Sequence, residues 1–129
     1  MSEHVWIRIG AISGFLAVAL GAFGAHALEE RLTTNQTLDI WETASRYHLV
    51  HTLAMILPVC TRKVPLRPAL WFGLGCLIFS GSLYLLAFAN WRWLGMVTPV
   101  GGLCFLIGWG RLAWLAGSVK LSQSSDTPS

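Results

Sequence analysis

Charged side chains are scarce in this chain. They make up 12% of its 129 residues, whereas they make up about a quarter of an average soluble protein. They are missing altogether from residues 9–25, 68–91 and 93–110. About 20 consecutive apolar residues are enough for a helix to cross a bilayer. The composition therefore excludes an ordinary soluble domain and predicts an integral membrane protein.

Motifs of catalytic chemistry are also missing. The sequence has no P-loop, no CxxC, no Ser-His-Asp order and no carboxylate pair suited to catalysis. Its three cysteines, Cys60, Cys76 and Cys104, lie in different apolar segments. That arrangement is typical of small buried side chains rather than of a disulfide framework or a metal motif. The pattern does not indicate an enzyme, and no cofactor is required by the sequence.

The uncharged runs define the predicted helices. A fourth run, residues 47–61, is too short to span on its own, so its helix must begin earlier and include Glu42 and Arg46. These two side chains are four positions apart and are placed to pair. Pro99 removes a backbone donor and is expected to bend the last helix. The predicted fold is an all-α, four-transmembrane-helix bundle in one domain, residues 1–120, followed by a polar, disordered tail, residues 121–129. The predicted helices are 6–28, 38–61, 69–90 and 94–117.

Basic and aromatic residues indicate the orientation in the membrane. An even number of helices places both termini and the 62–68 loop on one side, and that side carries six of the nine basic residues. The positive-inside rule then predicts cytoplasmic termini. The basic residues are read as topology signals with lipid headgroups as partners, and nucleic acid is not expected. The seven tryptophans fall near predicted helix ends, as in aromatic belts. The six basic residues are Arg8, Arg62, Lys63, Arg67, Arg111 and Lys120.

Small residues recur at helical spacing in the apolar runs. In lipid, helices associate mainly through close contact of such residues. The first run carries five of them at spacings of 4, 3, 4 and 3, which keeps them on one helix face. Their contacts could lie within the chain, with another membrane protein or with a second copy. The predicted packing residues are Gly10, Gly14, Ala17, Gly21, Gly24, Ser80, Gly81, Ser82, Gly101 and Gly102.

A cluster of polar side chains marks the outer end of the first two predicted helices. His48 and His51 are three apart on the second helix, and His26 ends the first at a similar depth. Ionisable groups at membrane depth are candidates for function because they are costly to bury. Three histidines could ligate zinc or copper, or His26 and one partner could bind haem. A quinone or lipid site, or hydrogen bonds that lock the two helices, are the alternatives. The cluster comprises His26, Glu42, Arg46, Tyr47, His48 and His51.

Several of these stretches together resemble a known family. GAISGFLAVALGAFGAHAL resembles the first-helix signature, and TASRYHLVHTLA the second-helix pattern, of the domain-of-unknown-function-423 membrane proteins (YgdD-like). FSGSLYLLA and VTPVGG are similar to that family's third and fourth helices. The resemblance implies a small four-helix protein of the bacterial inner membrane, with mitochondrial relatives and no established activity. Members often carry Gln where this chain has His48, which disfavours a three-histidine metal site and favours Tyr47, His26 and His51 as site residues.

Two functions follow from these observations. The first is a non-enzymatic structural or accessory subunit that packs through its Gly/Ala/Ser helix faces. The second is a ligand-binding membrane protein that uses the outer-side His/Tyr cluster for a quinone, a lipid, or a metal or haem. The lipid bilayer is the expected surrounding in both cases.

Overall fold

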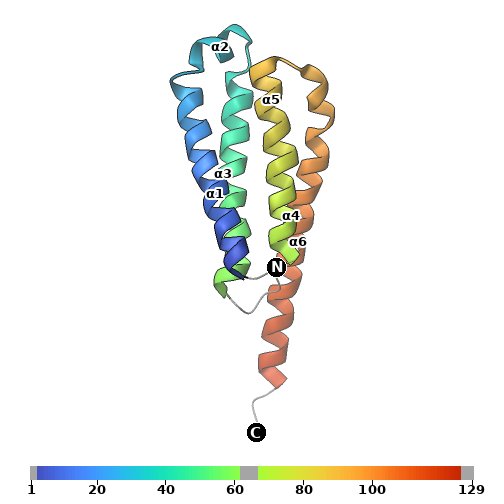
Figure 1. The fold of residues 1–129 in the computed structure, drawn as a ribbon. Coiled ribbons are helices and arrows are strands. Elements are labelled where there is room, and N and C mark those ends of the chain that lie inside the picture. The colour runs from blue at the N-terminus through green and yellow to red at the C-terminus, as the bar shows by residue number, and fades with distance from the viewer. Residues whose placement is uncertain (1–2, 62–66, 126–129) are drawn as a thin grey trace.

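The computed structural model describes residues 3–61 and 67–125, and these residues are helical throughout apart from short connections (Figure 1). α1 and α3 run side by side, joined at one end by the short helix α2, and the later helices return along them. The start of α1 and the end of α6 lie at the end opposite α2. The elements are α1 Glu3–Ala25, α2 Glu29–Thr34, α3 Leu38–Thr61, α4 Arg67–Gly75, η1 Cys76–Ser80, α5 Gly81–Ala89, η2 Arg92–Met96 and α6 Thr98–Ser125.

Three helical segments among the described residues are long and apolar enough to cross a membrane: His4–Ala25, Arg67–Ala89 and Arg92–Gly117. α3 has 24 residues but is not one of them, because its charged residues and its histidines lower its mean hydropathy. The structure thus supports an all-α membrane protein with three apolar spans, one fewer than the sequence predicts.

The helix bounds differ from the predicted ones mainly at the α2 end. α3 coincides with the predicted 38–61, whereas α1 ends at Ala25 and not at residue 28. α2 was not predicted at all. The helix α6 reaches Ser125, into the tail expected to be disordered. Arg62 and Lys63, on which the predicted orientation partly depends, lie outside the described residues.

Pro99 does not bend a helix. A 3₁₀ turn, η2, precedes α6, so Pro99 is the second residue of α6. Its missing N–H costs nothing in a first helical turn, where that group has no intrahelical partner. The hydroxyl of Thr98 donates to the carbonyl of Leu94 at 3.2 Å. The expected kink is replaced by a helix start.

The segment around α2 closes the end of α5. The hydroxyl of Thr37 donates to the carbonyl of Ala87 at 2.8 Å, and the amide of Asn35 donates to the same carbonyl at 3.2 Å. Arg31 Nε donates to the carbonyl of Phe88 at 3.0 Å and its guanidinium lies 4.2 Å above the Phe88 ring. Carbonyls at a helix C-terminus lack intrahelical donors, and a cation there complements the helix dipole. This segment is therefore a cap on α5.

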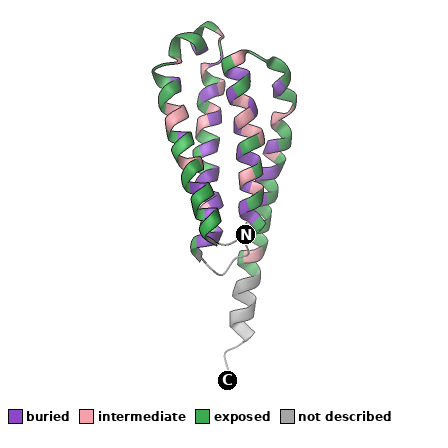
Figure 2. Ribbon diagram, in the orientation of Figure 1, coloured by how far each residue is buried: buried purple, intermediate pink, exposed green. Residues whose placement is uncertain are grey.

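Buried side chains lie on the facing sides of the helices (Figure 2). They form one cluster around Met55 and Phe72 and a second around Leu32 and Tyr84. Two tryptophans expected in the aromatic belts belong to these clusters instead: Trp6 is 6% exposed and Trp41 is 4% exposed. Trp41 also donates from Nε1 to the carbonyl of Leu20 at 2.9 Å. These two residues hold helices together, so the belt prediction is wrong for them.

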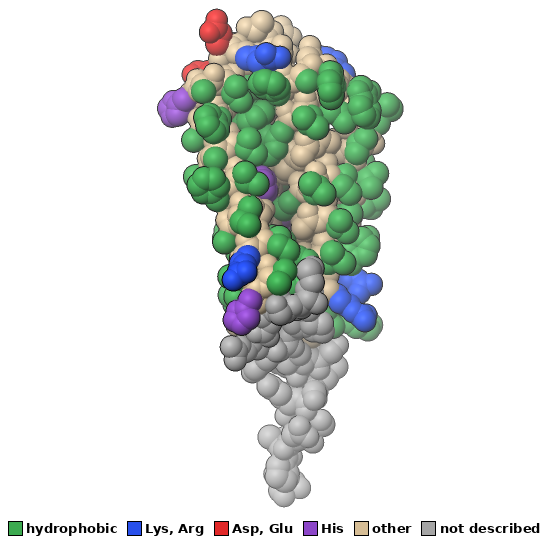
Figure 3. All heavy atoms as spheres, in the orientation of Figure 1, with side chains coloured by type: hydrophobic (Ala, Val, Ile, Leu, Met, Phe, Trp, Pro, Cys, Tyr) green, Lys and Arg blue, Asp and Glu red, His purple; other side chains and the backbone are tan. Residues whose placement is uncertain are grey.

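The outer surface is apolar along the length of the helices. Hydrophobic side chains cover the visible face, with Lys, Arg, Asp and Glu side chains at its two ends (Figure 3). The sides of α1 and α6 expose large apolar residues, among them Phe15 at 74% and Leu106 at 69%. Such a surface matches the hydrocarbon region of a bilayer.

The small residues of α1 lie against α3. A Cβ added to Gly10 would come within 2.5 Å of Ile56, and one added to Gly21 within 2.8 Å of the Ser45 hydroxyl. Gly24 leaves no room for a Cβ beside Trp41. Ala17 is 2% exposed, and Gly14 has only an ordinary contact of 3.6 Å with Thr52. The stripe therefore makes contacts within the chain.

The small residues of the later helices are less uniform. A Cβ on Gly101 would overlap the backbone of Phe79. One on Gly102 would lie 3.8 Å from the Phe79 ring, and one on Gly81 would meet nothing within 4 Å. Ser82 shares a hydrogen bond of 2.9 Å with Thr98.

Residues Cys76–Ser80 form a π-helical turn between α4 and α5. Turns of this kind insert a residue into a helix and are frequent at functional sites. Ser80 is fully buried, and its hydroxyl has no hydrogen-bond partner among the described residues. The backbone of Phe79, within this turn, is what a Cβ added to Gly101 of α6 would overlap.

Candidate functional site

His51 of α3 is enclosed and fully hydrogen-bonded. It is 6% exposed, and its Nδ1 lies 2.8 Å from the carbonyl of Tyr47. The indole Nε1 of Trp109 donates to His51 Nε2 at 3.2 Å. Because an indole only donates, Nε2 must accept and the proton must be on Nδ1, which donates to the carbonyl. His51 is thus a neutral imidazole with no lone pair left for a metal.

Aromatic rings surround this imidazole. The Phe105 ring stacks on it with centroids 3.6 Å apart, and the Tyr47 ring lies nearly parallel to it at 5.6 Å. Tyr47 also contacts Phe79 at 4.7 Å and is 43% exposed. Tyr47 therefore packs against the ring of His51 at the surface of the bundle. Tyr47 thus contacts His51 both through its backbone carbonyl and through its ring.

His48 faces other helices than His51 does. Its Nε2 shares a hydrogen bond of 3.1 Å with the Ser13 hydroxyl of α1, and its Nδ1 shares one of 3.4 Å with the Tyr84 hydroxyl of α5. Ser13 also bonds the Thr52 hydroxyl at 2.7 Å. The thiol of Cys76 donates to the carbonyl of His48 at 3.8 Å. His48 therefore connects three helices, whereas His51 connects α3 to α6.

A groove opens beside His48, between α1 and the continuous helix formed by α4, η1 and α5. Its volume is about 390 Å³. Ile9, Ile12 and Leu16 form one wall and Leu77 belongs to the opposite wall. In Figure 3 histidine atoms are visible deep in a hollow on this face, and His48 is the described histidine that lines the groove. Ser13, Tyr84 and Cys76 line it as well. The lining of the groove is thus apolar except around His48, where Ser13 and Tyr84 add hydroxyl groups.

His26 does not join the other histidines. It is exposed at the end of α1, where it borders an apolar hollow with Phe15 and Phe23. Among the described residues, no group of three His, Cys, Asp or Glu side chains could hold a metal ion. The structure thus does not bring together His26, His48 and His51 as the metal and haem hypotheses require.

Glu42 and Arg46 lie apart from both histidine sites. Both are exposed, and they border a hollow beside Gly21, Gly24 and Trp41. Both side chains line the same hollow, and their pairing stays a prediction.

Sequence reasoning missed the partners of the two histidines. Ser13, Thr52, Tyr84 and Trp109 are single polar-tipped residues in apolar segments. A buried donor or acceptor in a membrane helix needs a partner on a neighbouring helix. That requirement is the signal by which Ser13 and Tyr84 could have been paired with a histidine.

The contact between His51 and Trp109 predicts a coupling that His26 does not share. His51→Phe and Trp109→Phe should each destabilise the protein, and their double variant should deviate from additivity by about 0.5–3 kcal/mol, as for residues in direct contact. His51→Phe combined with His26→Ala should be additive to within about 0.5 kcal/mol. Thermal unfolding in one detergent measures both cycles. Coupling between His26 and His51 would contradict the separation of the two side chains.

Comparison with known proteins places the chain in a family. The profile described as "Protein of unknown function (DUF423)" matches residues 20–102. A UPF0382 membrane protein of Staphylococcus epidermidis is 42% identical over 81% of this chain and 88% of its own length. The UPF0382 inner membrane protein YgdD of Escherichia coli K12 is 40% identical over 95% of both chains. No solved structure matches the chain. The resemblance seen in the sequence is confirmed, and this chain belongs to the DUF423 family of membrane proteins.

Proposed function

We propose that this chain is a four-helix, non-enzymatic protein of the inner membrane that binds a neutral, lipid-soluble molecule in the groove between α1 and α4–α5. The observation that carries the proposal is the position of Ser13, His48 and Tyr84 in an otherwise apolar groove. The membrane assignment is supported by the relatives, one of which is named an inner membrane protein.

The fourth span is α3. Its polar residues are turned into the bundle: His48, His51 and Thr52 are each at most 9% exposed, and all three have hydrogen-bond partners. Its exposed residues in the same region are apolar, such as Leu53 at 61% and Val50 at 50%. The low mean hydropathy of α3 thus comes from polar side chains that face the other helices and are hydrogen-bonded there. Such side chains are not exposed to lipid.

The orientation follows from the basic residues. In the sequence, six of the nine basic residues lie at the start of α1, in or beside the 62–68 loop, or from the middle of α6 onward, and this end should therefore face the cytoplasm. In a cysteine-free background, an impermeant maleimide added to intact cells should label Gln36→Cys and not Pro65→Cys. Labelling of position 65 would reverse the orientation.

The groove defines the chemistry of its ligand. Its volume of about 390 Å³ is in the range of small-molecule sites. Among the described residues that line it, none is Asp, Glu, Lys or Arg. A charged ligand would therefore be buried without a counterion, which is strongly unfavourable. The hydroxyls and the imidazole suit a carbonyl or hydroxyl oxygen, and the leucine and isoleucine side chains suit an apolar body. A quinone or a neutral lipid has this form.

The small-residue faces give less support to an accessory subunit. Gly10, Gly21 and Gly24 are covered by side chains of α3, and Gly101 is covered by η1. Because these contacts are made within the chain, the residues are not available to a partner helix. The ligand-binding alternative therefore has the stronger physical basis.

The test fills the groove without disturbing the fold. Gly81 borders the groove and a Cβ there meets nothing within 4 Å, so Gly81→Phe should occupy the space. Gly110, which also has open space around it, lies outside the groove and Gly110→Phe is the matched control. Native mass spectrometry with a short-chain ubiquinone and a monoacylglycerol as probes should show binding of one of them to the wild type and the control. Gly81→Phe should lose that binding. Equal binding by all three proteins, or no binding of either probe to the wild type, would refute the proposal.

A further inference from the structure

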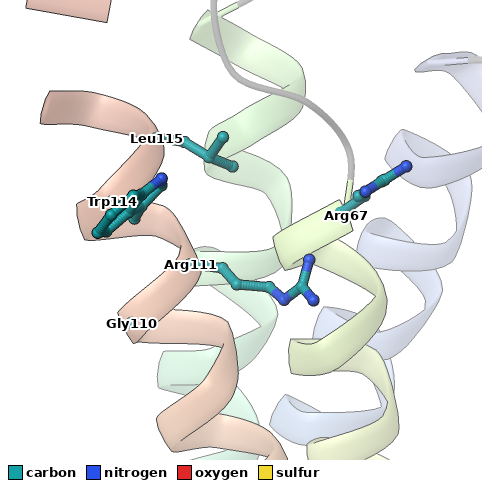
Figure 4. Close-up of a pocket in the computed structure, with 5 residues that line it drawn as sticks. All are labelled: Arg67, Gly110, Arg111, Trp114 and Leu115. Carbon is teal, nitrogen blue, oxygen red and sulfur yellow. The ribbon is translucent and has the colours of Figure 1, made fainter. Parts of the chain in front are cut away.

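A second hollow lies at the end of the bundle opposite α2. Its volume is about 530 Å³, and it is bordered by the start of α4 and by one turn of α6. Arg111 reaches from α6 toward the start of α4, where Arg67 is the first residue (Figure 4). Trp114 and Leu115 complete the lining on the α6 side, and Gly110 leaves space between them and α4. The hollow thus combines two guanidinium groups with an apolar side.

The positive charge of this hollow has no counterion on the helices that form it. Neither α4 nor α6 contains an Asp or Glu, and there is none anywhere in residues 43–125. Arg67 also begins the continuous helix Arg67–Ala89, whose first N–H groups carry a partial positive charge. The guanidinium carbon of Arg111 lies 6.0 Å from the centre of the Trp71 ring of α4, which is the outer limit of a cation–π contact. An anion bound in the hollow would therefore meet no competing acidic side chain on α4 or α6.

The position of the hollow identifies the source of that anion. Trp114 is 78% exposed and lies near the end of the apolar segment Arg92–Gly117, where exposed tryptophans are found at the level of lipid headgroups. A guanidinium binds phosphate oxygens in a bidentate manner. We propose that Arg67 and Arg111 bind the phosphate of one anionic phospholipid in the leaflet at this end, with Trp114 and Leu115 against its glycerol and first acyl carbons. This site is separate from the groove and does not depend on it.

The experiment measures retention of phosphatidylglycerol. The full chain is reconstituted in nanodiscs of phosphatidylcholine that contain a minor fraction of phosphatidylglycerol, and the bound lipid is counted by native mass spectrometry. A surface arginine contributes about 1 kcal/mol to binding of anionic lipid, which corresponds to about fivefold. Arg67→Gln and Arg111→Gln should each lower retention about fivefold, and the double variant more than about tenfold. Gly110→Phe should also lower it by filling the hollow.

Two controls separate this site from general attraction and from the groove. Arg92→Gln removes the same charge from the opposite end of the bundle and should lower retention less than the double variant does. Gly81→Phe in the groove should leave retention unchanged. Equal retention by Arg92→Gln and the double variant would refute the site. Inorganic phosphate is the second probe: it should not raise the melting temperature in pure phosphatidylcholine. Stabilisation by inorganic phosphate equal to that by phosphatidylglycerol would show a free-phosphate site and overturn the lipid assignment.

Discussion

Gly101→Ala is expected to destabilise the protein by about 3 kcal/mol, at the upper end of the usual cost of overpacking. The added Cβ would overlap the backbone nitrogen and Cα of Phe79 in η1. A flexible side chain could rotate away from such a methyl group, but a backbone has to move as a whole. Movement of η1 would separate α6 from the helix Arg67–Ala89, against which it packs. Thermal unfolding in mild detergent measures the loss.

The neighbouring glycine provides the control for this prediction. A Cβ on Gly102 would lie 3.8 Å from the Phe79 ring, an ordinary van der Waals distance. Gly102→Ala should therefore change the stability by less than about 0.5 kcal/mol, as for substitutions away from sensitive sites. Equal melting temperatures for Gly101→Ala and Gly102→Ala would contradict the close approach of α6 to η1.

His48→Leu is expected to lower the free energy of unfolding by about 1–3 kcal/mol, because it removes the hydrogen-bond partner of one side chain on α1 and one on α5. The Ser13 hydroxyl keeps Thr52 as a partner, whereas the Tyr84 hydroxyl loses its bond to the imidazole. Leaving a buried polar group without its partner costs about 1–3 kcal/mol. The polar part of the groove lining is reduced by the same change. Binding of the groove probe should weaken together with the melting temperature.

His48→Gln separates hydrogen bonding from the imidazole ring. A glutamine side chain both donates and accepts, so it can serve Ser13 and Tyr84 in place of the imidazole. We expect His48→Gln to lose less than half of what His48→Leu loses. Tyr84→Phe should then cost less in the His48→Leu background than in the wild type, because the Tyr84 hydroxyl has already lost its bond to His48 and keeps only that to Ser45. Equal losses for the Gln and Leu variants would show that the bonds to Ser13 and Tyr84 contribute nothing.

Much of the fold could be predicted from uncharged runs alone. Charge-free runs predicted the three apolar spans. The second helix was expected to begin before Glu42 because a 15-residue run is too short to span, and α3 begins at Leu38. α2 was missed because a six-residue helix has no periodicity to recognise. Its role depends on bonds from Thr37 and Asn35 to α5, which connect residues about 50 positions apart.

The candidate site was predicted in part, and its failures have one cause. Depth along a helix can be estimated from the rise per residue, but that estimate does not say which neighbouring helix a side chain faces. The direction of a side chain around the helix depends on which neighbour it meets, and the sequence does not specify that. His26 has a suitable depth but faces outward, and His48 and His51 bond to partners on different helices.

The groove beside His48 lies between the sides of α1 and the helix Arg67–Ala89. In the proposed membrane setting it opens toward the acyl chains, and this determines how the proposed binding has to be measured. A lipid-soluble molecule reaches such a site by diffusing within the bilayer, so it exchanges one hydrocarbon surrounding for another and gains little from leaving water. Every lipid molecule that touches α1 and α4 competes for the same space. The binding constant is then a ratio of mole fractions in the membrane. Diluting the sample with buffer should leave occupancy unchanged, whereas adding lipid at constant ligand should lower it.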